Sequence, residues 1–189
     1  QEGAAAMSIF ISVLKDKSRK WSKPRKISQD QTRSEQNPLL FLLDNGLLKL
    51  IHTAQETRSP DDTTWQDKNT TFSMQWTAKL RTQFRKLNGR SWSKSSDLFS
   101  LEAFCRNPPY RRSDGCWLLP IYRSLEEGGG FGHDHSEVLL LDHKGHTIDK
   151  PIPVPSSQGR VHGSIVVSQD GTQLIQFFRS RLADRVYRS

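Results

Sequence analysis

The sequence lacks the features that mark several protein classes. Its 189 residues contain no uninterrupted apolar run of about 18 residues, so no membrane span is predicted. Residues 1–13 hold an apolar patch with no basic region before it, which does not match a signal peptide. No segment carries the sustained apolar stripe of an amphipathic helix. Apolar residues instead come in short runs bounded by Gly, Pro, Asn or Asp, a pattern typical of strands in sheets buried on both faces.

Cysteine is scarce. Cys105 and Cys116 flank a predicted turn, so they are either a disulfide across a hairpin or two buried thiols. Neither has a second Cys or a His at the short spacing of structural zinc sites. His133 and His135 alternate in a glycine-rich segment and supply no set of three or four convergent ligands. The sequence therefore predicts no metal site, and nothing in it indicates a cofactor.

Acidic residues are outnumbered. The chain has 28 Lys and Arg against 20 Asp and Glu, a formal net charge of +8, which favours an anionic partner such as a nucleic acid, an acidic glycan or a carboxylated sugar. Much of the excess lies in residues 15–26 and 81–90, which we expect at sheet edges, where lysines discourage aggregation. A solvated face is the common role of such runs. No nucleic-acid-binding motif is present, so nucleic acid is not the predicted partner.

An internal repeat organises the chain. Each of three copies, at residues 37–51, 107–122 and 162–178, has an opening strand, a tight turn and a second apolar strand. The turns contain Asn45-Gly46, Asp114-Gly115 and Asp170-Gly171. Such dipeptides favour two-residue hairpin loops, in which both central residues need a positive φ. Three hairpins are therefore predicted.

A second element recurs out of phase with the first. It reads Lys20-Trp21-Ser22-Lys23-Pro24, then Ser91-Trp92-Ser93-Lys94, then Thr147-Ile148-Asp149-Lys150-Pro151. Trp21, Trp92 and Ile148 precede the next turn glycine by 25, 23 and 23 residues. This near-constant offset predicts successive copies of one supersecondary unit.

The turn glycines are 69 and 56 residues apart, more than the roughly 40–45 residues of a compact four-stranded propeller blade. We therefore expect an inserted loop in each repeat, at residues 57–71 and 126–135. Third strands are expected at residues 74–80 and 137–142.

The Trp-bearing turns resemble the Asp-box of the sialidase (neuraminidase) superfamily, Ser-x-Asp-x-Gly-x-Thr-Trp. Each copy keeps a different part of this pattern. The first copy has Asp16 and Trp21, the second has Gly89, Ser91 and Trp92, and the third has Gly145 and Thr147. Residues 105–122 and 160–181 are similar to successive blade openings in the predicted-neuraminidase branch of that superfamily.

The resemblance implies an all-β fold, a β-propeller of the six-bladed sialidase type, with about three to four blades' worth of sequence present. Residues 1–189 are expected to form a single partial propeller domain. Its predicted divisions are the end of one blade (1–28), a second blade (29–99), a third (100–155) and the start of a fourth (156–189). Open blade edges would permit self-association.

The resemblance also implies a function. It indicates a sialidase-like glycoside hydrolase domain acting on an acidic sugar, such as a sialic-acid-like sugar, or an inactive copy of one. The alternative is a non-catalytic propeller module that binds glycan or protein, because one fold hosts many functions.

Candidate site residues follow from the same likeness. Sialidases hold the sugar carboxylate with three arginines, because paired guanidinium donors fit a planar anion. They use a Tyr nucleophile with a Glu, and an Asp as acid/base. Four residues are predicted to bind substrate: Arg179, which resembles one of those arginines, Arg106, which opens an inner strand, and Arg181 and Asn107.

His162 is the predicted catalytic residue. It stands where the family has the glutamate that supports the tyrosine, nine positions before Gly171. A histidine there would act as acid/base near neutral pH, and a hydrogen-bonded structural histidine is the alternative. For the arginines the alternative is a salt bridge or a solvated strand end. Trp65 and Phe131, in the expected long loops, are candidates for stacking on a sugar.

Overall fold

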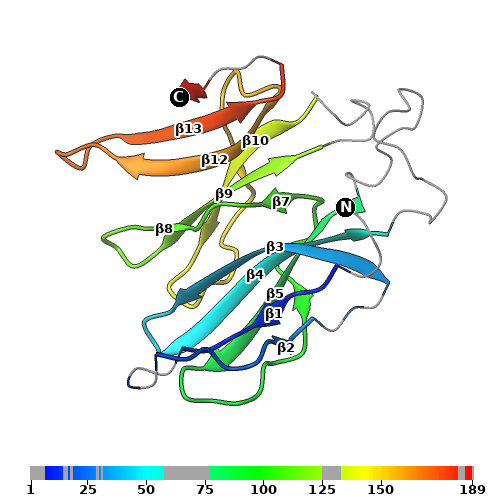
Figure 1. Ribbon diagram of the computed structural model, residues 1–189. Coiled ribbons are helices and arrows are strands. Elements are labelled where there is room, and N and C mark those ends of the chain that lie inside the picture. Colours follow the sequence, from blue (N-terminus) through cyan, green and yellow to red (C-terminus); the bar gives the residue numbers. More distant parts are fainter. Residues whose placement is uncertain are drawn as a thin grey trace.

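The computed structural model describes residues 7–14, 17, 19–28, 30, 32–57, 77–124, 133–182 and 186–188. The expected loop at 57–71 lies outside this part except for residue 57, as do Trp65, Phe131 and most of the expected loop at 126–135. The described residues form antiparallel strands in four sheets, shown in Figure 1. No helix among them is long and apolar enough to cross a membrane.

The first two sheets come from the N-terminal half. A two-stranded sheet contains β1 (Phe10–Ile11) and β2 (Arg25–Lys26). The next sheet has the order β3-β4-β5-β6, that is Arg33–Leu42, Leu47–Glu56, Lys79–Lys86 and Ser96–Asp97. Its strands follow one another across the sheet in chain order, as expected for a propeller blade.

The other two sheets repeat this plan. In the third, β7 (Phe104–Cys105) and β8 (Tyr110–Arg111) both pair with β9 (Trp117–Arg123). The sheet continues through β10 (His135–Leu141) to β11 (Ile152–Pro153). The fourth has β12 (Arg160–Val167), β13 (Leu174–Ser180) and β14 (Val186–Arg188). The all-β prediction is confirmed.

The predicted turn positions are right, but the predicted loop type is wrong. Leu43 and Leu47 share a hydrogen bond across the first turn, N to O 2.9 Å, and Gly46 N donates to Leu43 O at 3.0 Å. The loop therefore has three residues, and only the glycine has a positive φ, +77°. The Asn and Asp of the dipeptides serve another purpose: Asn45 Oδ1 accepts from Leu47 N at 3.1 Å, and Asp114 and Asp170 accept equivalent bonds.

The predicted third strands need correction. The sequence predicts the first at 74–80. Residues 74–76 lie outside the described part of the chain, and β5 runs from Lys79 to Lys86, six residues beyond the predicted end. Arg81 and Arg85 made this strand look like charged surface. Arg81 in fact lies inside the sheet, where its guanidinium pairs with Asp30 at 3.3 Å and Asp97 at 2.7 Å. The second expected strand, at 137–142, is β10 and begins two residues earlier, at His135.

The main core fills the space between the β3–β6 sheet and the β7–β11 sheet. Its buried residues include Ile51, Leu80, Leu119 and Leu139. Phe41 and Trp117 pack across this interface with ring centroids 4.9 Å apart. This packing fixes how two successive sheets face each other.

The cysteines are two thiols in the structure, not a disulfide. Cys105 is buried in the same core, and its Sγ lies 3.8 Å from Thr53 Oγ1. Burial raises the pKa of the Cys105 thiol to about 12, which keeps it protonated and unreactive near neutral pH. Cys116 is half-buried.

The Trp-Ser-Lys repeat has a repeated geometry. Ser22 Oγ accepts from Val13 N at 2.9 Å, and Ser93 Oγ accepts from Phe84 N at the same distance. Each serine also donates its backbone N–H to the same partner residue, Ser22 N to Val13 O and Ser93 N to Phe84 O. The two turns are thus equivalent parts of successive units.

Candidate functional site

A break in strand pairing recurs in the first strand of three sheets, nine positions before the turn glycine. In β3 the register shifts between Gln36 and Leu39, and in β12 between Val161 and Ser164. In the third sheet the gap between β7 and β8 takes this place. Asn37 and His162 adopt φ of +53° and +57°, conformations that non-glycine residues rarely adopt outside functional or tightly held positions.

His162 lies in the break of β12. Its side chain is half-buried and meets the buried Tyr122 ring edge to face, with centroids 5.3 Å apart. Tyr122 in turn stacks on Phe104 at 5.0 Å. Sequence reasoning missed Tyr122, although the buried run of β9 contains it.

The predicted arginines affect the pKa of His162. The pKa of His162 falls from 6.5 to about 4, first because burial penalises the charged ring and then because Arg106, Arg179 and Arg181 are positively charged nearby. The imidazole is therefore neutral at pH 7. It can accept a proton or a hydrogen bond there, and the acid/base role of His162 stays a prediction.

The arginines come from two sheets. Arg106 is exposed between β7 and β8, Arg179 is exposed in β13 opposite Val161, and Arg181 is half-buried just after β13. We call these three residues with His162 the arginine cluster. A cluster of three cations around a neutral ring is an electropositive site suited to an anion.

Arg181 is anchored by a buried carboxylate. Its Nε lies 2.9 Å from Oδ2 of Asp134, whose side chain is fully buried. Asp134 also accepts a hydrogen bond from Ser124, and its backbone oxygen accepts from Gly159 N at 2.7 Å. Sequence reasoning noticed Asp134 only as the residue between two histidines, and missed this role.

Asn107 binds the backbone of β12 at the break in strand pairing. Its Nδ2 donates to His162 O at 2.8 Å and to Gly163 O at 3.0 Å. These bonds link the third and fourth sheets directly beside His162. The structure thus shows Asn107 positioning the backbone of His162.

The two histidines of the glycine-rich segment do not join the cluster. His133 is exposed, and His135 Nε2 lies 2.8 Å from Glu137 Oε1. In the ranges that the structure describes, no group of three or more His, Cys, Asp or Glu side chains is placed to hold a metal ion.

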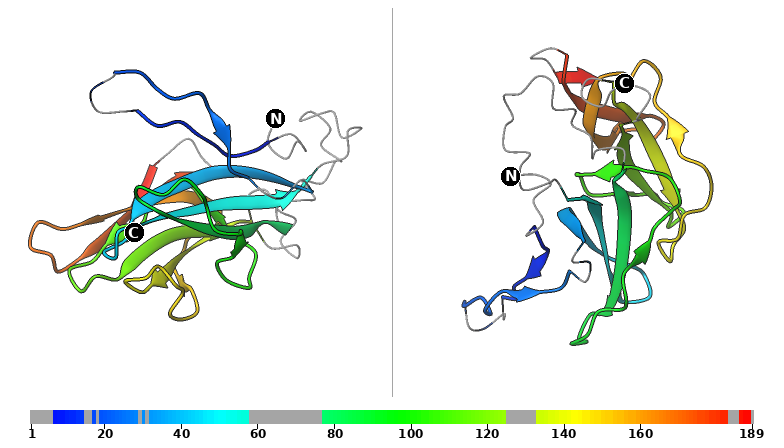
Figure 2. Two further views of the ribbon diagram at one scale, coloured as in Figure 1. Left: turned by 90° about the horizontal axis from the view of Figure 1, so that it is seen from below. Right: turned by 90° about the vertical axis from the view of Figure 1, so that its right-hand side faces the viewer.

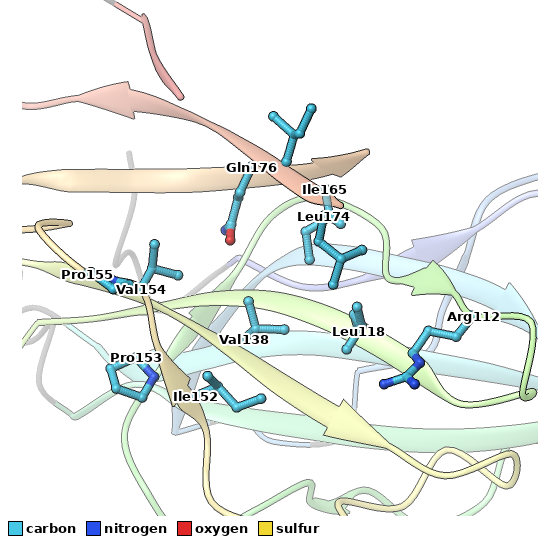
Figure 3. A pocket seen from close by; sticks show the side chains of 11 residues that line it. Arg112, Leu118, Val138, Ile152, Pro153, Val154, Pro155, Ile165, Leu174 and Gln176 are labelled. Carbon is cyan, nitrogen blue, oxygen red and sulfur yellow. The ribbon is translucent and has the colours of Figure 1, made fainter. Parts of the chain in front are cut away.

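An apolar groove of about 290 Å³ lies between the third and fourth sheets. Figure 3 shows Leu118 and Val138 on one side and Ile165 and Leu174 on the other, with the amide of Gln176 at its edge. The matching space between the second and third sheets is filled by Phe41 and Trp117.

Comparison with protein families identifies the repeat. The model of the BNR repeat-like domain matches residues 1–189. The chain belongs to this family. No curated protein matches the sequence.

Solved structures show the fold of this BNR repeat-like domain. Hadza microbial sialidase Hz136 is similar with a TM-score of 0.66 at 13% identity, over 96% of this chain and 38% of that protein. A protein of unknown function from Dyadobacter fermentans gives a TM-score of 0.64 at 17% identity, over 90% and 52% of the two chains. An endo-arabinase from Bacteroides thetaiotaomicron gives 0.53 at 12% identity, over 96% and 63%.

The sheets are therefore blades of a β-propeller of the sialidase type. The chain spans about two fifths to three fifths of the length of these structures. The predicted blade boundaries remain predictions.

Proposed function

We propose that this BNR repeat-like domain binds an acidic sugar at the arginine cluster, as part of a sialidase-like glycoside hydrolase. The observation that carries the proposal is the placement of the three arginines on the strands around His162. Arg106 precedes Asn107, whose Nδ2 binds the His162 backbone oxygen at 2.8 Å, and Arg179 lies opposite Val161, next to His162, with Arg181 two residues further on. The positive charges of all three lower the pKa of His162. Guanidinium groups bind carboxylates through paired donors, each charged hydrogen bond contributing about 1.5–3 kcal/mol.

The chemistry favours a carboxylated sugar over a neutral one. Arg181 is paired with the buried Asp134, whereas Arg106 and Arg179 are exposed. The cluster therefore keeps an excess of positive charge beside a neutral ring. A carboxylate offsets these charges. The likeness to a sialidase supports the same substrate class.

Binding without turnover is the second candidate. Sialidases need an acid/base carboxylate, and the carboxylate that the structure places beside the cluster, Asp134, is fully buried and paired with Arg181. A neutral His162 with a pKa of about 4 does not donate a proton at pH 7. Both facts favour a sugar-binding module in this polypeptide.

Calorimetric titration with N-acetylneuraminic acid tests the proposal. We expect Arg179→Ala to weaken binding roughly 10- to 100-fold, the loss of one charged hydrogen-bonded pair. Arg179→Lys should be intermediate, because it keeps the charge but not the paired donors. The exposed Lys150 supplies a control, Lys150→Ala, which should bind like the wild type.

The methyl ester of the same sugar separates charge from shape. The proposal requires weak binding of this neutral ligand, and equal affinity for acid and ester would contradict it. A fluorogenic sialoside then distinguishes the two candidates: turnover abolished by Arg179→Ala indicates a hydrolase, and binding with no turnover by folded protein indicates a binding module.

A further inference from the structure

A second electropositive surface lies away from the arginine cluster, on the hairpin formed by β1 and β2. Figure 2 shows this hairpin, in blue, projecting from the body of the molecule in both views. Residues 10–28 contain seven Lys or Arg and a single acidic residue, Asp16. The hairpin is therefore an exposed concentration of positive charge.

A second basic segment lies against the hairpin. Residues 85–94 contain four Lys or Arg and no Asp or Glu. Arg25 Nη2 donates to Arg90 O at 2.9 Å, and Ile11 and Trp92 pack on a buried cluster that includes Ile27. Two runs far apart in sequence thus form one surface.

We call this surface the rim patch. Its exposed cations are Lys17, Arg19, Lys20, Lys23, Arg25, Lys26, Lys86, Arg90 and Lys94. The nearest described carboxylates in sequence, Asp30 and Asp97, are both paired with Arg81, so they are already engaged elsewhere.

The equivalent turn of the third sheet shows that this charge is not a requirement of the fold. Residues 142–151 carry Lys144 and Lys150 but also Asp142 and Asp149. That turn is charge-balanced, whereas the two turns of the rim patch are not. A sheet edge needs a few lysines, but a concentration of this size in two adjoining turns attracts anionic partners.

Aromatic side chains accompany the cations. The Trp21 side chain is 67% exposed, and Arg85 lies over the Trp92 ring at 5.3 Å. A single exposed indole on a projecting hairpin differs from the charged groove with successive aromatic side chains that single-stranded nucleic acid binders use. It suits a flexible chain of charged sugars, whose apolar ring faces pack on an indole.

We propose that the rim patch binds an anionic polysaccharide. The ammonium groups of its lysines act as point charges, which suit sulfate and carboxylate groups spaced along a flexible chain. This surface is separate from the arginine cluster and does not depend on the function proposed for it.

Titration with a fluorescent heparin decasaccharide, followed by anisotropy, tests the proposal on the full chain. If about four cations contact the polyanion, affinity should fall roughly 100-fold between 50 and 200 mM salt, by analogy with counterion release from nucleic acids. Lys23→Gln with Lys94→Gln should weaken binding at least about tenfold, since each lysine near an anionic surface contributes about 1 kcal/mol. Lys144→Gln with Lys150→Gln, the matched change on the balanced turn, should bind within about twofold of the wild type.

Three outcomes would overturn the proposal. Equal binding by the rim variant and the wild type would remove the patch from the interaction. Tighter binding of a single-stranded DNA with the same number of charges would make the partner a nucleic acid. Loss of heparin binding in Arg179→Ala would place the polyanion at the arginine cluster. Circular dichroism and thermal melts check that each variant is folded.

Discussion

Lys49 is the buried charge whose energetic effect can be worked out most directly. Its side chain is fully buried in the core between the second and third sheets. Its Nζ has no hydrogen-bond partner among the described residues and lies 4.1 Å from the centre of the Phe84 ring. Burial lowers the pKa of Lys49 from 10.5 to about 8, although the charge of Asp142 acts in the opposite direction.

This shift predicts that Lys49→Met stabilises the protein. A lowered pKa of this size corresponds to a cost of about 3 kcal/mol for holding the charged form in the folded state at pH 7. The contact with Phe84 offsets about 1 kcal/mol of it. Replacing the ammonium by a thioether of similar length should therefore raise the free energy of unfolding by about 2 kcal/mol at pH 7.

The pH dependence gives the sharper test. Between pH 8 and 10.5 the unfolded chain holds the Lys49 proton and the folded chain does not, so this group makes the wild type more stable as pH rises. The advantage of Lys49→Met should shrink by about 2 kcal/mol between pH 7 and pH 10, measured by urea denaturation. Lys144→Met, at an exposed lysine, is the control and should change stability by less than about 0.5 kcal/mol at both pH values. A variant that destabilises at pH 7, or whose effect is the same at both pH values, would refute this reasoning.

Two further predictions concern packing. Urea denaturation should show that Gly145→Ala destabilises the protein by at least about 1 kcal/mol more than Gly46→Ala. Both glycines have a positive φ, but a Cβ on Gly145 would lie 2.6 Å from the buried Lys49 side chain, whereas a Cβ on Gly46 would meet open space. Equal losses would mean that the neighbour moves aside. Iodoacetamide at pH 8 should leave Cys105 unmodified in the folded protein, because the thiol is buried and its pKa is about 12, and denaturation should expose it. Peptide mapping with half-buried Cys116 as the internal comparison checks this; rapid native labelling of Cys105 would be inconsistent with the buried position.

Local patterns in the sequence predicted the positions of the hairpins well. Turn dipeptides fix hairpins because an Asn or Asp side chain caps the loop and the following glycine takes a positive φ. The loop length was wrong, because the same dipeptides also serve three-residue loops. β5 was misplaced because Arg81, paired on both sides within the fold, looks like surface when only the sequence is read.

The candidate site was predictable only in part. The fixed offset from the turn glycine located His162, and the family likeness supplied the arginines. Their effect on the pKa of His162 depends on burial and on side chains from another sheet, which no local pattern reports. The roles of Asn107 and Asp134 were hidden for the same reason, since their partners are 55 and 47 residues away in sequence.

The most direct test of the central claim is an NMR titration of the His162 ring with and without N-acetylneuraminic acid, with His162→Gln to assign the signal. We predict a pKa of about 4 in the free protein and a rise of about one unit or more with the bound carboxylate, because the anion offsets positive charge of the arginines. The neutral methyl ester should leave the pKa unchanged. A pKa near 6.5 in the free protein, or no change on adding the acid, would contradict an anion site at the arginine cluster.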